Sequence, residues 1–214
     1  MKSLHGIDVE RMRAFADAVF AIAITLLALE MGVPEGLPSG RLAHALEEAL
    51  PSVAGYALSF LVVGALWLSH HRLFSMVKRL DGTLLQLDLA LLGIVAALPF
   101  PTRVVSSYHG SPVATSLYAA TIAVAALLLA VMSARLRLRP DLCHADVPRD
   151  LLTGSMLVSG AVAAVFATSV PLALISPNVA EYWWIAVVPL RRWLVKRYDR
   201  AAAATAGRGD PLGA

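Results

Sequence analysis

The sequence predicts an all-α integral membrane protein with six membrane-spanning helices in a single domain. Of its 214 residues, 58% are hydrophobic and only 15% are charged, which is too apolar for an ordinary soluble domain. Six apolar runs approach the length of about 20 residues that a helix needs to cross a bilayer core. The expected spans are 11–31, 52–76, 83–105, 112–134, 151–175 and 179–195. The alanine-rich tail, 201–214, is expected to be disordered.

The first span, from Arg11 to Met31, has two different faces when it is wound as a helix. Its larger side chains form one ridge, which consists of Phe15, Val19, Ile22, Thr25, Leu26 and Leu29. Smaller side chains, which would let a neighbouring helix approach closely, lie away from the ridge at Ala14, Ala21 and Ala28. The periodicity fits a ridge that packs in a bundle core, faces lipid or lines a pore.

Glycines and prolines between 32 and 40 interrupt the chain after the first span, and a short surface helix is expected over 41–49. Pro51 suits the first helical position of the second span, because the N–H that proline lacks would have no partner there. Pro99 and Pro101 are expected to bend or end the third span near its far end.

The last three spans differ in character. The fourth is the most lipid-like, and the fifth contains small residues for helix contacts at Gly154, Ser155, Ser159 and Gly160. The sixth has the shortest apolar run, because Arg191 interrupts it. Aromatic residues typical of the membrane interface flank this run, and they are Tyr182, Trp183, Trp184 and Trp193.

Basic residues predict the orientation of the chain. Sixteen of the 18 Lys and Arg residues fall on the side that holds both termini in a six-span topology, whereas Arg41 and Arg103 fall on the other. The positive-inside rule therefore places both termini in the cytoplasm and the chain in the inner (plasma) membrane. The basic charge reflects this topology and not nucleic-acid binding. The single cysteine, Cys143, cannot form an intramolecular disulfide and argues against a cysteine-built metal site.

The same topology brings polar side chains of the first three spans to one depth, towards the cytoplasmic end. They are Asp17, Trp67, His70, His71 and Asp88, and the expected cluster also includes Arg11 and Phe15 of the first span. Arg13 and Asp17, at i, i+4, could instead pair locally. Ionisable groups inside a membrane need partners or water, so a buried polar cluster is expected. One interpretation is that Asp17 accepts hydrogen bonds from His70, His71 or the Trp67 indole and locks the first two helices together. The other is direct contact with permeating ions or protons.

Three motifs resemble those of one known family. Arg11, Phe15 and Asp17 stand in the order RxxxFAD, followed directly by VFAIAITLLALE, and this stretch closely resembles the first helix of the transmembrane protein 175 (TMEM175) family. These proteins are bacterial relatives of the lysosomal potassium channel. WLSHHRLF in the second span is similar to the family's WxxHH signature, and LPFPT in the third is similar to a further motif. The chain departs from the family pattern at two positions. Ala16 stands where a serine is usual, and Asp88 stands where an amide or neutral residue is usual.

The resemblance implies a homotetramer in which four copies of the first helix surround a central pathway, with potassium as the favoured ion. It also implies hydrophobic rings at Ile22, Leu26 and Leu29, with Ile22 as the constriction and Thr25 offering hydroxyl oxygens beside it. Potassium would pass these residues transiently, and no tightly bound metal or cofactor is expected. The sequence contains no TVGYG filter, so the expected selectivity is modest.

Three other classes of function compete with a potassium channel. One is a purely structural membrane module, which would show no flux at all. A proton channel or proton-coupled transporter would use Asp17, His70, His71 and Asp88 as a relay, since histidine titrates near neutral pH. An intramembrane enzyme is not expected, because the sequence contains neither HExxH nor GxSxG.

Overall fold

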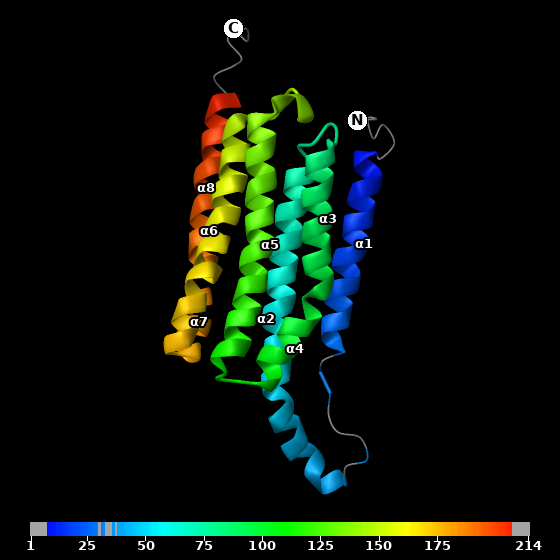
Figure 1. Cartoon of the computed structure of the whole chain (residues 1–214), viewed down its shortest axis with the longest axis vertical. Helices are drawn as coiled ribbons and strands as arrows, with labels where there is room; N and C mark the ends of the chain where they lie inside the picture. Colours follow the sequence, from blue (N-terminus) through cyan, green and yellow to red (C-terminus); the bar gives the residue numbers. More distant parts are fainter. Residues whose placement is uncertain (1–7, 30, 33–35, 37, 207–214) are drawn as a thin grey trace.

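The computed structural model describes residues 8–29, 31–32, 36 and 38–206, and the regular structure of this part of the chain is helical. Figure 1 shows the helices as a bundle, with the first and last described helices at its two edges. The α-helices are α1 (Val9–Ala28), α2 (Leu42–Phe74), α3 (Gly82–Ala97), α4 (Pro99–Ser107), α5 (Pro112–Leu138), α6 (Arg149–Ile175), α7 (Pro177–Trp184) and α8 (Val187–Ala206).

Four helical stretches of the described chain are long and apolar enough to cross a membrane. They are Leu42–Phe74, Gly82–Ser107, Pro112–Leu138 and Arg149–Ile175, and they correspond to the second to fifth expected spans. The first expected span corresponds to α1, whose initial turns carry Glu10, Arg11, Arg13 and Asp17. An all-helical membrane protein is therefore confirmed as the fold class.

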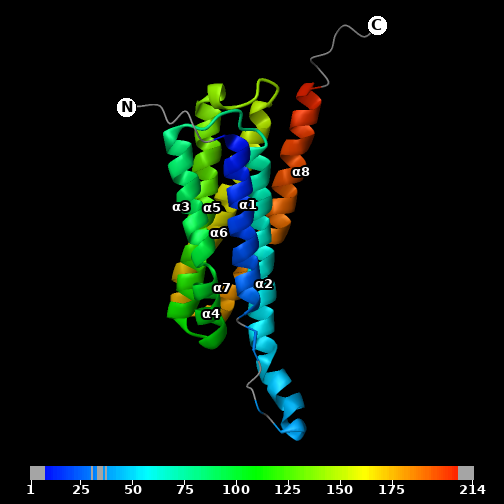
Figure 2. The same ribbon diagram turned by 90° about the vertical axis from the view of Figure 1, so that its right-hand side faces the viewer.

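Helix α5 occupies the middle of the bundle, where α6 packs along it (Figure 1). Its inward side chains are fully covered, among them Tyr118, Ile122, Met132 and Leu136. Helix α1 lies at the opposite edge from α8 in Figure 1, and it packs against α2 and α3. In Figure 2, α1 runs along the front of the bundle beside α2. The core therefore extends from α6 to the inner side of α1, and the outer side of α1 is left uncovered.

Helix α2 corrects the predicted start of the second span. The surface helix expected over 41–49 and the span expected from 52 form one helix of 33 residues, with Pro51 inside it instead of at its first position. Proline removes one helical hydrogen bond, to the carbonyl of Glu47. Because α2 projects beyond the bundle in this region (Figure 1), water can reach that carbonyl and the helix continues.

The third span breaks where its prolines predicted. Helix α3 ends at Ala97 and α4 begins at Pro99, because Pro99 and Pro101 cannot donate the next helical hydrogen bonds. Three buried hydroxyl groups support the break: Ser59 Oγ lies 3.0 Å from Thr102 Oγ1 and 3.2 Å from Tyr118 Oη. Thr102 donates to the Leu98 carbonyl at 2.9 Å, so Tyr118 donates to Ser59 and Ser59 to Thr102.

The sixth expected span, 179–195, is not one continuous helix. Helix α7 ends at Trp184 and α8 begins at Val187. Pro189 stands in the first turn of α8 and cannot donate to the Ile185 carbonyl, so a hydrogen bond that would continue α7 into α8 is missing. Helix α8 then continues to Ala206, which corrects the prediction of disorder over 201–206, because alanine has the highest helix propensity. The rest of the predicted tail, 207–214, lies outside the described residues.

At the end of the bundle where α1 begins and α2 ends, the loop before α3 pairs with the loop before α6. The Lys78 N–H donates to the Leu142 carbonyl at 2.8 Å, and the His144 N–H donates to the Met76 carbonyl at 3.1 Å. Between these bonds, Cys143 is buried, and its thiol lies 3.8 Å from the Leu136 carbonyl. Burial, followed by the charge of Asp141, raises the pKa of the Cys143 thiol.

Ion pairs reinforce this loop pairing. The hydrogen bonds from Arg139 and then Arg79 lower the pKa of Asp141 to about 2. Partial burial acts to raise the pKa of Asp81, but hydrogen bonds from Arg135 and the Leu84 N–H outweigh it, and the pKa is lowered. Both carboxylates are therefore charged at neutral pH.

The tightest approach between α6 and α8 depends on Gly154, and it allows a matched test. A Cβ at Gly154 would lie 2.6 Å from Tyr198 Cβ, whereas a Cβ at Gly160 would meet no atom within 4 Å. We expect Gly154→Ala to destabilise the protein by about 1–3 kcal/mol through overpacking. Gly160→Ala should be neutral or stabilising by up to about 1 kcal/mol, because alanine favours helix.

Thermal unfolding of the detergent-purified protein, followed by fluorescence-detected gel filtration, measures both variants of this glycine pair. A melting temperature lowered equally by the two substitutions would contradict the assigned close contact between α6 and α8.

Candidate functional site

The ridge of α1 is the most exposed apolar surface on this helix. The exposed fractions are 51% for Phe15, 58% for Ile22, 41% for Leu26 and 77% for Leu29. Thr25 lies among them, and its hydroxyl donates to the Ile22 carbonyl at 2.8 Å. The proton of this hydroxyl is therefore directed along the helix, and the oxygen lone pairs remain available to a ligand on the exposed side.

The opposite face of α1 packs into the bundle. Its buried side chains are Met12, Ala16, Phe20, Ala23 and Leu27. Ala16 is fully covered, so the position at which the family pattern has a serine belongs to the packed face of α1 and not to its ridge. The two faces match the helical period, and α1 thus presents its ridge away from its own chain.

A short hydrogen bond ties α1 to α2 beside the ridge. The Trp67 indole N–H donates to Asp17 Oδ1 at 2.7 Å. The His71 ring packs beside the indole, with ring centres 5.5 Å apart. A hydrogen bond to a carboxylate is stronger than one between neutral groups, so this contact fixes the rotation of α1 against α2.

A second polar pair lies deeper and joins α2 to α3. His70 Nε2 lies 2.8 Å from Asp88 Oδ1, and both side chains are buried, at 2% and 0% exposed. The His70 ring stacks on Phe74 at 4.2 Å and lies 5.7 Å from the ring of Phe20 on α1. Within the described part of the chain, Asp88 Oδ2 has no hydrogen-bond partner.

The structure therefore divides the predicted cluster into two pairs. Asp17 binds Trp67, and the partner of His70 is Asp88 and not Asp17. Arg11 and Phe15 are exposed on α1 and join neither pair in the described residues. The buried hydroxyl groups of Ser59 and Tyr118 were not predicted, since a serine or tyrosine inside an apolar run gives no sequence signal of its partner.

Within the described residues, no group of three or more His, Cys, Asp or Glu side chains could hold a metal ion. Four helical stretches of the described chain are long and apolar enough to cross a bilayer, which defines a multi-pass α-helical membrane protein. One face of α1 is uncovered, the pair of Trp67 with Asp17 is partly exposed, and the pair of His70 with Asp88 is buried.

Comparisons with known proteins give the family. The model of the endosomal/lysosomal potassium channel TMEM175 family matches residues 11–99. Residues 11–99 are thus similar to the TMEM175 family, which agrees with the resemblance seen in the sequence. This segment contains α1 from Arg11 onwards, α2 with its WLSHHRLF stretch, and α3.

Curated relatives match over about half of the chain. A potassium channel of Streptomyces collinus is 46% identical over 121 residues, which are 55% of this chain and 59% of the relative. A potassium channel of Chamaesiphon minutus is 40% identical over 114 residues, 51% of this chain and 56% of the relative. The chain thus spans little more than half the length of these relatives.

Solved structures extend the likeness to nearly the whole fold. The crystal structure of a lysosomal potassium-selective channel TMEM175 homolog from Chamaesiphon minutus has a TM-score of 0.74 at 27% identity, covering 89% of this chain and 97% of that one. The potassium channel MtTMEM175 has a TM-score of 0.64 at 16% identity, covering 93% of this chain and 96% of that one, and supports the fold alone.

Proposed function

We propose that this chain is the subunit of a potassium-selective cation channel in which four copies of α1 surround a central pathway. The observation that carries the proposal is the uncovered ridge of α1, with Ile22 at 58% and Leu29 at 77% exposed. Matched relatives from Streptomyces and Chamaesiphon are potassium channels, and the shared fold with a potassium-selective homologue supports the same function here. The family is one of channels, so no enzymatic activity is assigned.

In the proposed tetramer, Ile22, Leu26 and Leu29 form successive apolar rings, and Ile22 is the constriction. A ring of branched apolar side chains closes a pathway by dewetting, because an ion cannot keep its hydration shell while passing it. Thr25 lies between these rings, and its outward lone pairs can replace part of the shell of a potassium ion. Selectivity set by one hydroxyl ring and a constriction is modest.

The polar pairs then have a positioning role. The bond from Trp67 to Asp17 holds the rotation of α1 against α2, which decides whether Ile22 points at the pathway. The pair of His70 with Asp88 holds α2 against α3. The basic residues place both termini in the cytoplasm by the positive-inside rule, in the inner membrane.

A proton channel is the alternative function. TMEM175 relatives from chicken and mouse, 29% and 36% identical, are proton channels. A relay needs neighbouring groups that each accept and donate a proton. The Trp67 indole, which contacts both Asp17 and the His71 ring, only donates. The division into two pairs therefore favours the positioning role over a relay.

Ion flux from vesicles that contain the purified protein tests the channel. Under a potassium gradient we expect flux that exceeds the flux under an equal sodium gradient by a modest factor. A pH-sensitive dye inside the same vesicles detects protons. Flux carried by protons alone, or no flux of any ion, would contradict the proposed function.

A further inference from the structure

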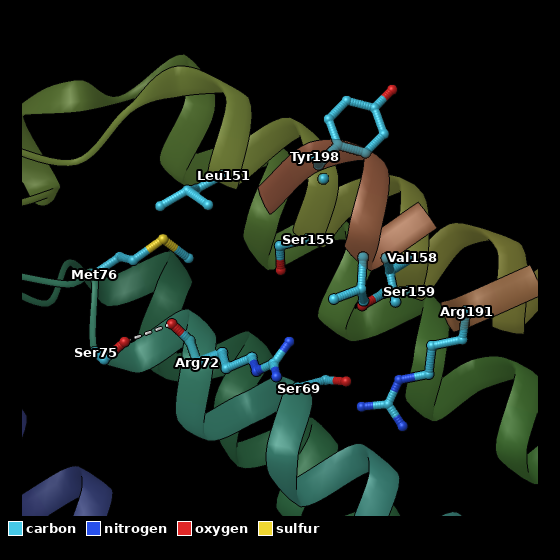
Figure 3. Close-up of a pocket in the computed structure, with 12 residues that line it drawn as sticks. Ser69, Arg72, Ser75, Met76, Leu151, Ser155, Val158, Ser159, Arg191 and Tyr198 are labelled. Carbon is cyan, nitrogen blue, oxygen red and sulfur yellow. Dashed lines mark hydrogen bonds between the residues drawn. The ribbon is translucent and has the colours of Figure 1, made fainter. Parts of the chain in front are cut away.

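Two arginines face one cavity between α2, α6 and α8, near the end of the bundle where α2 ends and α6 begins. The cavity has a volume of about 240 Å³. Arg72 extends into it from α2 and Arg191 from α8, and both guanidinium groups point into the space between the helices (Figure 3). The twelve lining residues include no Asp or Glu.

Neither arginine is neutralised by the protein. Among the described residues, the side chain of Arg72 makes no hydrogen bond or ion pair, and Arg191 makes one hydrogen bond, from Nη2 to the Ala65 carbonyl at 3.4 Å. Two like charges in a partly dry space repel each other more strongly than in water. An anion between them would relieve this repulsion.

Hydroxyl groups add to the anion-binding character of the cavity. Ser69 and Ser159 line it at the depth of Arg191, and Ser159 is only 4% exposed. The Ser159 hydroxyl has no hydrogen-bond partner in the described part of the chain. Planar guanidinium groups together with a free hydroxyl donor match the oxygen atoms of a phosphate group.

A second, apolar cavity continues inward from the first. Its volume is about 50 Å³, and it shares Ser69, Ser159 and Arg191 with the larger cavity. Its remaining walls are apolar, and they include Leu66, Val162 and Phe166. A basic mouth that leads into an apolar passage fits a molecule with an anionic head and a hydrocarbon chain, and fits a free phosphate ion less well.

We propose that this cavity binds an anionic phospholipid, with the phosphate between Arg72 and Arg191 and the first carbons of an acyl chain in the apolar passage. Basic pockets between membrane helices at the cytoplasmic end are suited to such headgroups. The lipid would join α2 to α8, which one hydrogen bond connects in the described structure, from Arg191 to the Ala65 carbonyl.

Native mass spectrometry of the detergent-purified protein, titrated with phosphatidylglycerol and with phosphatidylcholine, tests the site. We expect phosphatidylglycerol to bind at least about tenfold more tightly than phosphatidylcholine. A hydrogen bond to a charged group raises the binding affinity by about tenfold or more. Arg72→Gln and Arg191→Gln should each weaken its binding by about tenfold or more. Arg192→Gln is the matched control, since it removes the same charge from the next residue of α8, which does not line the cavity.

Inorganic phosphate and glycerol 3-phosphate serve as probes without a hydrocarbon chain, and we expect neither to protect the protein against thermal unfolding. Equal binding of the two lipids, unchanged binding in both arginine variants, or binding of either chain-free probe as tight as that of the lipid would overturn the proposal. If Arg191→Gln fails to fold, Arg72→Gln decides the question, because the Arg72 side chain makes no hydrogen bond within the described protein. None of these measurements uses ion flux, so their outcome is independent of the proposed channel.

Discussion

His70→Leu is expected to lower the free energy of unfolding by about 3 kcal/mol or more, because it leaves the Asp88 carboxyl buried without a partner. Asp88 is 0% exposed, and His70 supplies its one hydrogen bond among the described residues, at 2.8 Å. Asp88→Leu should cost less, since an unpartnered imidazole can stay neutral whereas a carboxyl group must take up a proton or remain as a buried charge.

The conservative and double variants separate the possible roles of this pair. Asp88→Asn keeps the hydrogen bond to a neutral His70 and should stay within about 1 kcal/mol of the parent. His70→Leu combined with Asp88→Leu should recover most of the loss, because an apolar pair needs no partner. Unfolding temperature in detergent measures all four variants.

Two results would contradict the positioning role. If Asp88→Asn is as destabilising as His70→Leu, the pair is ionic and the charge of Asp88 is required. If Asp88→Asn assembles normally and yet abolishes proton flux, the pair belongs to a relay, and the proton channel becomes the better description of the function.

Ile22→Asn is expected to raise potassium flux by about tenfold or more, since a polar ring at the constriction stays wet and removes the barrier to a hydrated ion. Ile22→Ala should also raise it, by widening the same ring. The side chain of Ile22 is 58% exposed in the single chain, so neither substitution removes a core contact. Flux from vesicles under a potassium gradient, normalised to the amount of assembled protein, is the measurement.

The matched control is Leu89→Ala on α3, where an apolar side chain is 47% exposed away from the ridge. It should leave flux unchanged. Potassium flux that does not respond to either Ile22 variant, or responds equally to Leu89→Ala, would remove α1 from the pathway. A selectivity for potassium over sodium that falls in Ile22→Ala would further support Ile22 as the constriction.

The ridge of α1 was predictable because the helical period alone decides which residues share a face. Phe15, Ile22, Leu26 and Leu29 are all exposed in the structure. The break at Leu98 was predictable for an equally local reason, since Pro99 and Pro101 remove donors wherever they stand. The family assignment followed from motifs within residues 11–99, the segment that the family model matches.

The partners of His70 and His71 could not be predicted in the same way. Adjacent residues on a helix point about 100° apart, so the two rings meet different neighbours. Which ring faces α1 and which faces α3 depends on the rotation of α2, and that rotation results from packing along the whole helix. The i, i+4 spacing already brings His71 beside Trp67 on the same helix. Only the structure shows that Trp67 reaches Asp17 on α1 and that His70 reaches Asp88 on α3.

The position of Pro51 within its helix could not be predicted, because it depends on neighbours that the sequence does not show. A proline fits the first turn of a helix, and it also fits the interior wherever water reaches the carbonyl that it leaves unpaired. Helix α2 projects beyond the bundle at this point (Figure 1), so Pro51 is found in the interior of the helix. The cavity of Arg72 and Arg191 could not be predicted for the same reason, because these two arginines are more than a hundred positions apart in the sequence.

The buried thiol of Cys143 makes the natural chain a suitable background for accessibility labelling. Maleimides and methanethiosulfonates react with the thiolate, and burial both covers this sulfur and raises its pKa, so it stays protonated at neutral pH. Because Cys143 is the single cysteine of the sequence, a cysteine introduced along α1 would be the one reactive position. The rate at which each such residue reacts from either side of the membrane would map where water enters, without a cysteine-free parent that disturbs the loop pairing.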